Sequence, residues 1–310
     1  MSAMRAVVVS EWGGPEVLVE REIERPAPGL GEILVRIRAA GVNPADWKTR
    51  TSGELVDWGE TAIVGWDVSG TVAAVGPGVT LFQPGDEVFG MPHFPRQAGG
   101  YAEYTAAPAR HFAAKPAALS HQEAAALPLA ALTAWQALVD TAGVGAGDRV
   151  LVHAAAGGVG HLAVQIAKAR GAYVIGTASA AKHELLRSLG ADEVVDYRSV
   201  AFEDVVGPVD AVLDNVGGDT GARSLKVLRP GGTLVTLPGP GDVPADADGV
   251  RTGWLLVEPD RHGMLEIAAL AESGRLRPVV DTVLPLAEAA KAHALGEQGR
   301  TTGKIVLTVD

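Results

Sequence analysis

The chain has 310 residues, of which 47% are hydrophobic, and this is enough for one large or two ordinary globular domains. Its formal net charge is −11 and its 26 Lys and Arg residues are scattered, so we expect no nucleic-acid-binding surface. Cysteine is absent, which excludes disulfides, thiol nucleophiles and cysteine-ligated metal sites. The N-terminus reaches charge and glycine too early for a secretory signal, and no apolar run approaches the roughly 18 residues of a membrane span. We therefore expect a cytoplasmic protein.

The first part of the chain, up to about residue 120, consists of short apolar segments separated by Gly and Pro turns. Such segments are typical of strands and favour an antiparallel, barrel-like sheet. The predicted strands are 5–9, 32–41, 69–76, 86–91 and 101–107. Residues 120–143 then predict an Ala-rich helix, which Ser120 and Glu123 open as a capping box and Pro128 interrupts.

From Arg149 onward, strand and helix patterns alternate, which predicts a parallel sheet with helices on its faces. The predicted strands are 149–154, 173–178, 193–197, 209–216 and 232–237, and the predicted helices are 157–171 and 180–190. Pro230–Gly232 is expected to be a plain turn into the last of these strands, and the strand patterns of the tail, 279–286 and 303–309, follow. The sequence thus predicts an α/β fold in which a nucleotide-binding domain, residues 125–260, is inserted into a second domain built from residues 1–124 and 261–310.

A glycine cluster lies between the first of these parallel strands and its helix. Gly157, Gly158 and Gly160 permit a tight turn and a close backbone approach to a pyrophosphate, which the N-terminus of the helix attracts. The first position of the usual G-x-G-x-x-G pattern is Ala155. A tight turn without a ligand is the alternative, but the surrounding strand and helix pattern favours a dinucleotide site.

The end of the next strand predicts which dinucleotide is bound. An acidic residue there accepts the 2′-hydroxyl of NAD, but this chain has Thr177, Ala178 and Ser179, and no acid before Glu184. Lys182 stands close by. The pattern favours NADP(H), and the alternative is that Lys182 only begins a solvated helix.

Six segments together resemble a known family. They are "GEILVRIRAAGVNPADWKTR", "GWDVSGTVAAVGPGVTLFQPGDEVFG", "GGYAEYTAAPA", "EAAALPLAALTAWQAL", "AAAGGVG" and "TTGKIVL". In order and spacing they resemble the quinone oxidoreductase branch of the medium-chain dehydrogenase/reductase superfamily. The resemblance covers nearly the whole chain. It implies a GroES-like β-barrel catalytic domain, a Rossmann domain, an active site in the cleft between them and a homodimer.

The zinc-dependent members of that superfamily provide a test of metal binding. The resemblance places Asn43, Trp66 and Leu129 where those members have zinc ligands, and the four-Cys structural zinc site is impossible without cysteine. We therefore expect no metal. Without zinc, alkoxide chemistry is disfavoured, whereas hydride transfer to a quinone or an α,β-unsaturated carbonyl needs only hydrogen-bond donors near the oxygen that gains charge.

The resemblance also implies candidate catalytic residues. Asn43 corresponds to an asparagine lining the nicotinamide and substrate pocket, and Thr133 to a residue that contacts the nicotinamide. Lys48 lies where relatives place pocket residues and has the charge to polarise a carbonyl. Asn43 as a simple turn residue before Pro44, and Lys48 as a surface residue, are the alternatives. No dedicated acid is evident, so we expect the final proton to come from water.

For the cofactor, NADPH, the resemblance implies three groups of residues. The glycine loop, for the pyrophosphate, comprises Ala156, Gly157, Gly158, Val159 and Gly160. Around the 2′-phosphate we expect Ser179, Lys182, Tyr197 and Arg300. Beside the nicotinamide ribose we expect Asn215, Val216 and Gly217.

The substrate itself stays open at this point. Segments 90–104 and 238–249 are expected to be loops that set specificity, and His93, Phe94 and Trp58 are candidate pocket residues or ordinary packing residues. An enoyl-thioester reductase, and a non-catalytic NADPH-binding or structural protein of the same fold, are the alternative functions.

Overall fold

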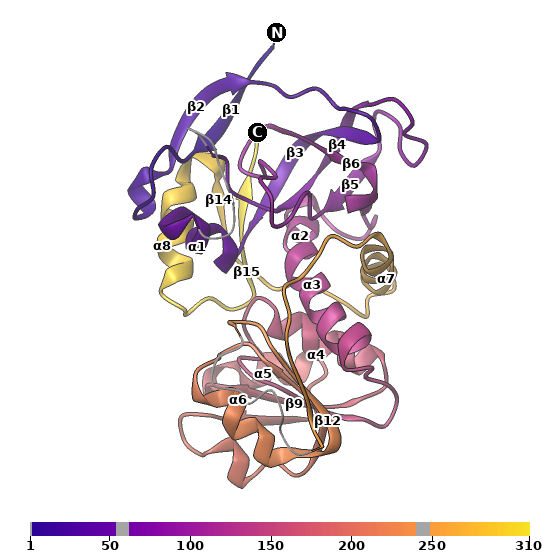
Figure 1. Cartoon of the computed structure of the whole chain (residues 1–310), viewed down its shortest axis with the longest axis vertical. Coiled ribbons are helices and arrows are strands. Elements are labelled where there is room, and N and C mark those ends of the chain that lie inside the picture. Colours follow the sequence, from indigo (N-terminus) through magenta and orange to yellow (C-terminus); the bar gives the residue numbers. More distant parts are fainter. Residues whose placement is uncertain (1, 54–61, 240–248) are drawn as a thin grey trace. The chain divides into compact units, whose positions relative to one another are not determined.

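The computed structural model describes residues 2–53, 62–239 and 249–310, and the chain divides into two compact units. Unit 1 comprises Met1–Leu132 and Glu258–Asp310, and unit 2 comprises Thr133–Val257. Figure 1 shows the C-terminal elements, in yellow, among the N-terminal elements of unit 1. The boundaries expected from sequence, 124/125 and 260/261, lie near these divisions. The first one follows the change in pattern near residue 120, whereas the units divide inside the helix that follows.

Unit 1 is built on a seven-stranded sheet in which β3 is the longest strand. The order is β14-β15-β3-β4-β5-β7, and β6 also pairs with β3. All its pairs are antiparallel except β14 with β15, and β1 and β2 form a separate antiparallel pair. The strands are β1 (Ala3–Val8), β2 (Val19–Glu24), β3 (Glu32–Val42), β4 (Asp67–Val75), β5 (Glu87–Gly90), β6 (Tyr104–Pro108), β7 (Phe112–Ala114), β14 (Val280–Pro285) and β15 (Lys304–Thr308).

The sequence predicted most of these strands, because their inward residues are apolar and form one buried cluster that includes Val7, Ile33 and Leu307. It did not predict β2, whose sequence VEREIE is charged and mostly exposed, or β7, which is only three residues long. The helices of this unit are α1 (Pro44–Ser52), α2 (His121–Ala125), α7 (Arg261–Glu272) and α8 (Ala289–Glu297), with single turns η1 (Pro15–Val17), η2 (Ala109–His111) and η7 (Leu286–Glu288).

The predicted helix after residue 120 forms, and it is broken where expected. The Ser120 hydroxyl accepts a hydrogen bond from the backbone N–H of Glu123, whose carboxylate accepts one from the backbone N–H of Ser120. Helix α2 ends at Ala125, and α3 (Pro128–Trp135) begins at the proline, a residue well suited to the first helical position. A π-helical segment, η3 (Gln136–Thr141), continues from α3.

Unit 2 contains a six-stranded parallel sheet in the order β10-β9-β8-β11-β12-β13. Its strands are β8 (Arg149–Val152), β9 (Tyr173–Ala178), β10 (Glu193–Asp196), β11 (Val209–Asp214), β12 (Leu228–Thr236) and β13 (Arg251–Trp254). Renumbered within the unit, the order is 3-2-1-4-5-6, which is that of a Rossmann fold. The predicted doubly wound α/β class is therefore confirmed.

The helices of unit 2 follow the strands, as the alternating pattern predicted. They are α4 (Gly160–Ala169), α5 (His183–Ser188) and α6 (Asp219–Ser224), with the turns η4 (Ala180–Lys182), η5 (Phe202–Asp204) and η6 (Leu225–Val227). One local prediction was wrong: Pro230–Gly232, expected as a plain turn, lies inside β12, where the register against β11 is irregular. Trp58 and most of segment 238–249 lie outside the described residues. Among the described helices, none is long and apolar enough to cross a membrane.

Candidate functional site

The glycine loop lies at the carboxyl end of β8, where the chain turns into α4. A Cβ atom on Gly160 would lie 2.4 Å from the carbonyl oxygen of Ala154 and 2.7 Å from the Cα of Ala155, so only glycine fits without a shift of the backbone. Ala154 itself has a positive φ of 47°. The two histidines flanking the loop have structural roles, since His161 contacts the Gly157 carbonyl oxygen and His153 is buried.

His153 joins the ends of neighbouring strands. Its ring nitrogens lie 3.2 Å from the Thr177 hydroxyl and 3.0 Å from the Ser224 hydroxyl. Burial lowers the pKa of His153 to about 4, so the ring is neutral at pH 7 and serves these hydrogen bonds. His153 therefore adds no charge next to the glycine loop.

Asn215 follows β11, the strand next to β8 at the point where the strand order reverses. Its amide nitrogen donates to the carbonyl oxygen of His153 at 2.7 Å. Its amide oxygen is buried and has no hydrogen-bond partner among the described residues. The next turn is held by Asp214, which accepts hydrogen bonds from the backbone N–H groups of Val216 and Gly217. An unpartnered acceptor at a Rossmann switch point is suited to a ligand hydroxyl group.

The predicted 2′-phosphate residues follow two paired strand ends. Ala178 of β9 pairs with Asp196 of β10, so Ser179 and Tyr197, the next residues, leave neighbouring positions of the sheet. Lys182 ends the turn η4, and Tyr197 is 55% exposed. Of the residues expected around the 2′-phosphate, Ser179, Lys182 and Tyr197 therefore lie in the same region of unit 2.

Arg198 is a residue of this region that sequence reasoning missed. Its guanidinium carbon lies 5.7 Å from the ring centroid of Tyr197, and its Nε donates to the Tyr197 hydroxyl at 3.4 Å. Its position directly after Tyr197 was the only available signal. Arg300, by contrast, belongs to unit 1 and is exposed between α8 and β15.

Asn43, in unit 1, is 1% exposed and joins β3 to α1. Its side-chain amide nitrogen donates to Asp67 Oδ2 at 2.8 Å, and its amide oxygen accepts a hydrogen bond from the Lys304 ammonium. Lys304 also lies 3.1 Å from the same carboxylate oxygen. Asn43 is also the N-cap residue of α1, directly before Pro44, which agrees with the alternative interpretation as a turn residue.

The backbone of Asn43 belongs to a second buried chain of hydrogen bonds. Its N–H donates to Asp46 Oδ2 at 2.7 Å, and the Tyr101 hydroxyl donates to the same oxygen at 3.0 Å. Tyr101 also lies 3.1 Å from His293 Nε2, and Arg50 lies beside His293 Nδ1. Because arginine only donates, Nδ1 accepts and Nε2–H donates to Tyr101.

Burial controls the protonation of this second chain. It raises the pKa of Asp46 to about 7, and the neighbouring Asp67 adds to the effect. Burial and the adjacent Arg50 lower the pKa of His293 to about 3. The pKa of Tyr101 is raised well above its usual value by burial and by Asp46. A neutral His293 and a neutral Tyr101 thus donate towards a carboxyl group that is only partly ionised at pH 7.

The other predicted residues have distinct surroundings. Lys48 lies on the exposed side of α1. Thr133 is 5% exposed on α3, one helical turn after Leu129. In segment 90–104, His93 has a positive φ of 57° and its backbone N–H donates to His111, while Phe94 packs edge-on against Trp66.

The three positions expected to replace zinc ligands do not form a zinc site. The amide oxygen of Asn43 is bound to Lys304, the Trp66 indole donates to the Arg96 carbonyl oxygen at 2.7 Å, and Leu129 has an aliphatic side chain. Zinc in proteins is held by Cys, His, Asp or Glu. Nowhere in residues 2–53, 62–239 and 249–310 do three or more such side chains form a group able to hold a metal ion.

Comparison with known proteins identifies the family. Residues 29–117 match the alcohol dehydrogenase GroES-like domain family, and residues 189–307 match the zinc-binding dehydrogenase family. A 2-methylene-furan-3-one reductase from Solanum lycopersicum is 38% identical over 99% of this chain and 79% of its own length. The chain belongs to the medium-chain dehydrogenase/reductase superfamily, in its quinone oxidoreductase branch.

Other relatives agree with this assignment. The NADPH-dependent alkenal/one oxidoreductase of Arabidopsis thaliana is 37% identical over 98% of this chain and 79% of its own length. The quinone oxidoreductase structure from Coxiella burnetii has a TM-score of 0.91 at 35% identity and covers 100% of both chains. A polyketide synthase of Streptomyces halstedii, GfsB, is 40% identical over 90% of this chain, which matches 5% of that large protein.

Proposed function

We propose that the chain is an NADPH-dependent, zinc-independent reductase that transfers hydride to a quinone or an α,β-unsaturated carbonyl. The observation that carries this proposal is the Asn43 amide, a buried hydrogen-bond donor held by two charged residues at a position where zinc-dependent relatives bind metal. The names of the tomato and Arabidopsis relatives and of the Coxiella structure support the same reaction class.

The residues present fit the cofactor. The N-terminus of α4 and the glycine loop would hold the pyrophosphate, and the unpartnered Asn215 oxygen would accept a hydrogen bond from a ribose hydroxyl. Lys182, Tyr197 and Arg198 would hold the 2′-phosphate through charge and hydrogen bonding. NADPH, when bound, supplies the hydride.

In this reaction hydride adds to an electron-poor carbon of the substrate. The π electrons shift towards the carbonyl oxygen, which becomes an enolate or phenolate oxygen and gains negative charge. Within the described part of the chain, the Asn43 amide nitrogen makes one hydrogen bond, to Asp67, so a second N–H is available for that oxygen. A donor held in place before the reaction stabilises developing charge without reorganisation.

Thr133 would help to orient the nicotinamide, and water would supply the final proton. Lys48, on the exposed side of α1, is the weakest of the three predicted catalytic residues.

The test is NADPH and NADH oxidation by the purified chain against quinones, enones and alcohol/aldehyde pairs, with and without a metal chelator. We expect NADPH oxidation with a quinone or an enone, insensitive to the chelator. Sensitivity to the chelator, or turnover of alcohols alone, would contradict the proposal. Binding of NADPH without turnover of any substrate would favour the non-catalytic alternative.

A second candidate function is reduction of an enoyl thioester. The similarity to a polyketide synthase segment favours it. A short enoyl-pantetheine thioester added to the panel separates the two candidates, since a carrier-bound substrate class predicts that the thioester is reduced faster than a free enone of equal length.

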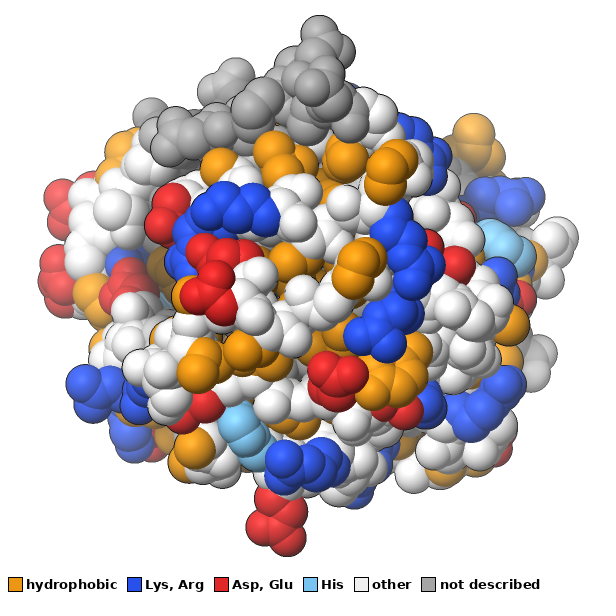
Figure 2. Space-filling view, turned by 90° about the horizontal axis from the view of Figure 1, so that it is seen from below, with side chains coloured by type: hydrophobic (Ala, Val, Ile, Leu, Met, Phe, Trp, Pro, Cys, Tyr) orange, Lys and Arg blue, Asp and Glu red, His pale blue; other side chains and the backbone are white. Residues whose placement is uncertain are grey.

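Three further features belong to this proposal. Among the strands of the described residues, β13 pairs on one side only, with β12, and Trp254 on it is 51% exposed, which supports a homodimer through this edge. Acidic, basic and apolar side chains all occur on the face drawn in Figure 2, and the formal net charge is −11, which supports a small-molecule substrate and no nucleic-acid partner. The cytoplasmic location stays a prediction. Light scattering on the purified chain tests the dimer.

A further inference from the structure

A buried ion pair lies beside Asn43. The side chains of Lys304 and Asp67 are 3% and 0% exposed, and they begin β15 and β4, the two strands that flank the end of β3. Removing two charges from water costs so much that such a pair is often no more stable than apolar residues in its place. A contribution to stability therefore does not account for the pair, and its surroundings suggest another role.

The pair determines which way the Asn43 amide faces. Lysine offers only donors and an ionised carboxylate only acceptors, so the amide oxygen must face Lys304 and the amide nitrogen must face Asp67. Rotating the amide by half a turn would place its N–H donors against the Lys304 ammonium and its oxygen against the Asp67 carboxylate, and neither contact would be a hydrogen bond. The direction of the second N–H is fixed by the same two contacts.

Asp67 also holds the start of α3. Its other oxygen, Oδ1, accepts a hydrogen bond from the backbone N–H of Leu129 at 2.6 Å. Leu129 is in the first turn of α3, where backbone N–H groups lack partners within the helix and negative charge is favourable. Thr133 lies one turn further along. One carboxylate therefore contacts both Asn43 and the helix that carries Thr133.

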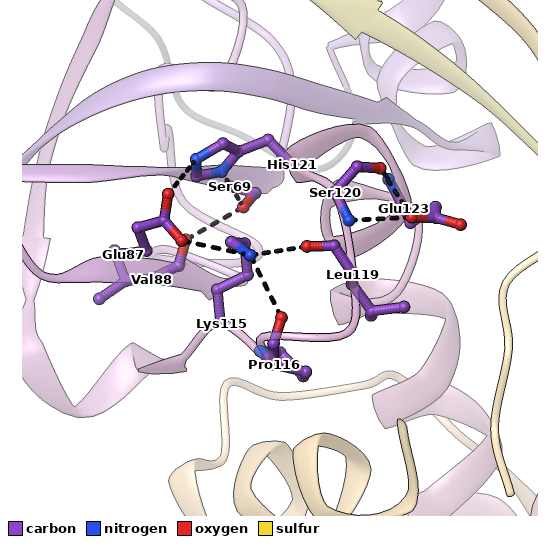
Figure 3. A network of polar contacts seen from close by, with 9 residues as sticks. All are labelled: Ser69, Glu87, Val88, Lys115, Pro116, Leu119, Ser120, His121 and Glu123. Atoms are coloured by element: carbon purple, nitrogen blue, oxygen red, sulfur yellow. Dashed lines mark hydrogen bonds and ion pairs between the residues drawn. The ribbon is translucent and has the colours of Figure 1, made fainter. Parts of the chain in front are cut away.

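The neighbouring helix α2 is held differently, as Figure 3 shows. Ser69, two residues after Asp67 on β4, lies with its hydroxyl 2.8 Å from Nδ1 of His121, the first residue of α2. The other ring nitrogen of His121 contacts Glu87, which also pairs with Lys115. Removing the Ser69 hydroxyl thus disturbs the same strand, β4, and the neighbouring helix α2, without removing a contact of Asn43 or of the start of α3.

We infer that Lys304 and Asp67 are positioning residues of the reductase site, and that their ion pair orients the Asn43 amide towards the reacting oxygen while Asp67 anchors the helix carrying Thr133. This inference rests on the proposed function and extends it to two residues that contact neither the cofactor nor the substrate.

The test compares Lys304→Met, Lys304→Arg, Asp67→Asn and the double variant Asp67→Asn/Lys304→Met with wild type, using NADPH and the quinone or enone that wild type reduces. Misplacing a reacting group by about 1 Å costs on the order of 100-fold, so we expect kcat of the double variant to fall by about 100-fold. Its melting temperature should exceed that of Lys304→Met, because it leaves no unpaired charge. Its dissociation constant for NADPH should change far less than kcat, because the residues expected to hold the pyrophosphate, and Lys182, Tyr197 and Arg198, lie in unit 2. Lys304→Arg should recover part of kcat.

Ser69→Ala is the matched control, and it should lower the melting temperature while kcat stays at the wild-type value. The inference is overturned if the double variant keeps the wild-type kcat, or if Ser69→Ala lowers kcat as much as the double variant does. A wild-type enzyme that binds NADPH but reduces nothing in the panel overturns the proposed function, and the inference with it, before any variant is compared.

Discussion

The two units of the molecule build their candidate sites in opposite ways. In unit 2 the site consists largely of backbone groups at strand ends, and the side chains beneath them are apolar or neutral, as His153 is. In unit 1 the site consists of buried side chains, two of them an ion pair, brought together from the ends of three neighbouring strands. A site of backbone groups therefore depends on the shape of a turn, whereas a site of buried charges depends on every partner being present.

The largest expected effect tests the buried charges of unit 1. Lys304→Met leaves Asp67 as an uncompensated buried charge, which should lower the free energy of unfolding by about 3–5 kcal/mol. Chemical denaturation measures it. The control is Lys168→Met, since Lys168 pairs with Asp192 on the surface of unit 2 with a side chain 44% exposed, and about 1 kcal/mol or less is expected there. Equal losses in both variants would remove the distinction between the two units.

The next effect concerns pH. The pKa of Asp46 is raised to about 7 in the folded chain, above its unfolded value, so its contribution to stability is present below about pH 4 and is lost as the pH rises through 7. Asp46→Asn keeps an oxygen acceptor for Tyr101 but does not titrate. We expect the variant to gain about 2–4 kcal/mol relative to wild type between pH 4 and pH 8.

Denaturation of both proteins at several pH values measures this gain. The contribution of His293 has the opposite sign, because its depressed pKa makes stability rise between about pH 3 and pH 6.5, and it cancels in the difference between the two proteins. Parallel stability curves for wild type and Asp46→Asn would contradict the prediction.

The shape-dependent site of unit 2 is tested by Gly160→Ala. The added Cβ would lie 2.4 Å from the Ala154 carbonyl oxygen, so the loop must shift. Strain of about 1–3 kcal/mol should weaken NADPH binding by roughly 10- to 100-fold. Fluorescence titration with NADPH measures it. Gly145→Ala, where the nearest atom to a new Cβ is 4.0 Å away, is the control and should bind normally.

The smallest effect is on the choice of coenzyme. Removing one charge in Lys182→Met or Arg198→Met should weaken NADPH by about tenfold, near 1.4 kcal/mol, and leave NADH unchanged. Comparing dissociation constants for both coenzymes measures the change, with Lys168→Met as a control on the same unit. Equal weakening of NADPH and NADH would show that these residues hold something other than the 2′-phosphate.

Much of unit 2 was predictable because its elements follow local rules. Strand and helix periods alternate from residue 149, and each predicted strand there has a counterpart in the sheet. The glycine loop was recognisable because Gly160 answers a steric demand that the residues around it create. Exceptions were local, such as Pro230–Gly232, which lie inside β12 at the register shift between the residues that pair with β11, Leu228 and Thr233.

Less of the unit 1 site was predictable. Asn43 was singled out from the resemblance, but its buried partners were not, because no local pattern marks an ionisable side chain as buried. These partners are Asp67, Lys304, Asp46, Tyr101 and His293. Asn43 and Lys304 are separated by 261 positions, and their contact exists because β15 pairs with β3. Lys304 occurs in "TTGKIVL", a segment used for the resemblance, where nothing in the sequence tells a buried lysine from an exposed one.

By itself, the sequence determined the fold class, the parallel sheet of unit 2, the glycine loop and the absence of cysteine chemistry, because these depend on periodicity, turn geometry and composition. Only the tertiary structure decided that Asn43 is held between Lys304 and Asp67, that Asp67 anchors α3, and that burial raises the pKa of Asp46 to about 7. The physical reason is that burial and long-range strand pairing set the solvation and the partners of a charged group, and neither property belongs to a residue until the chain has folded.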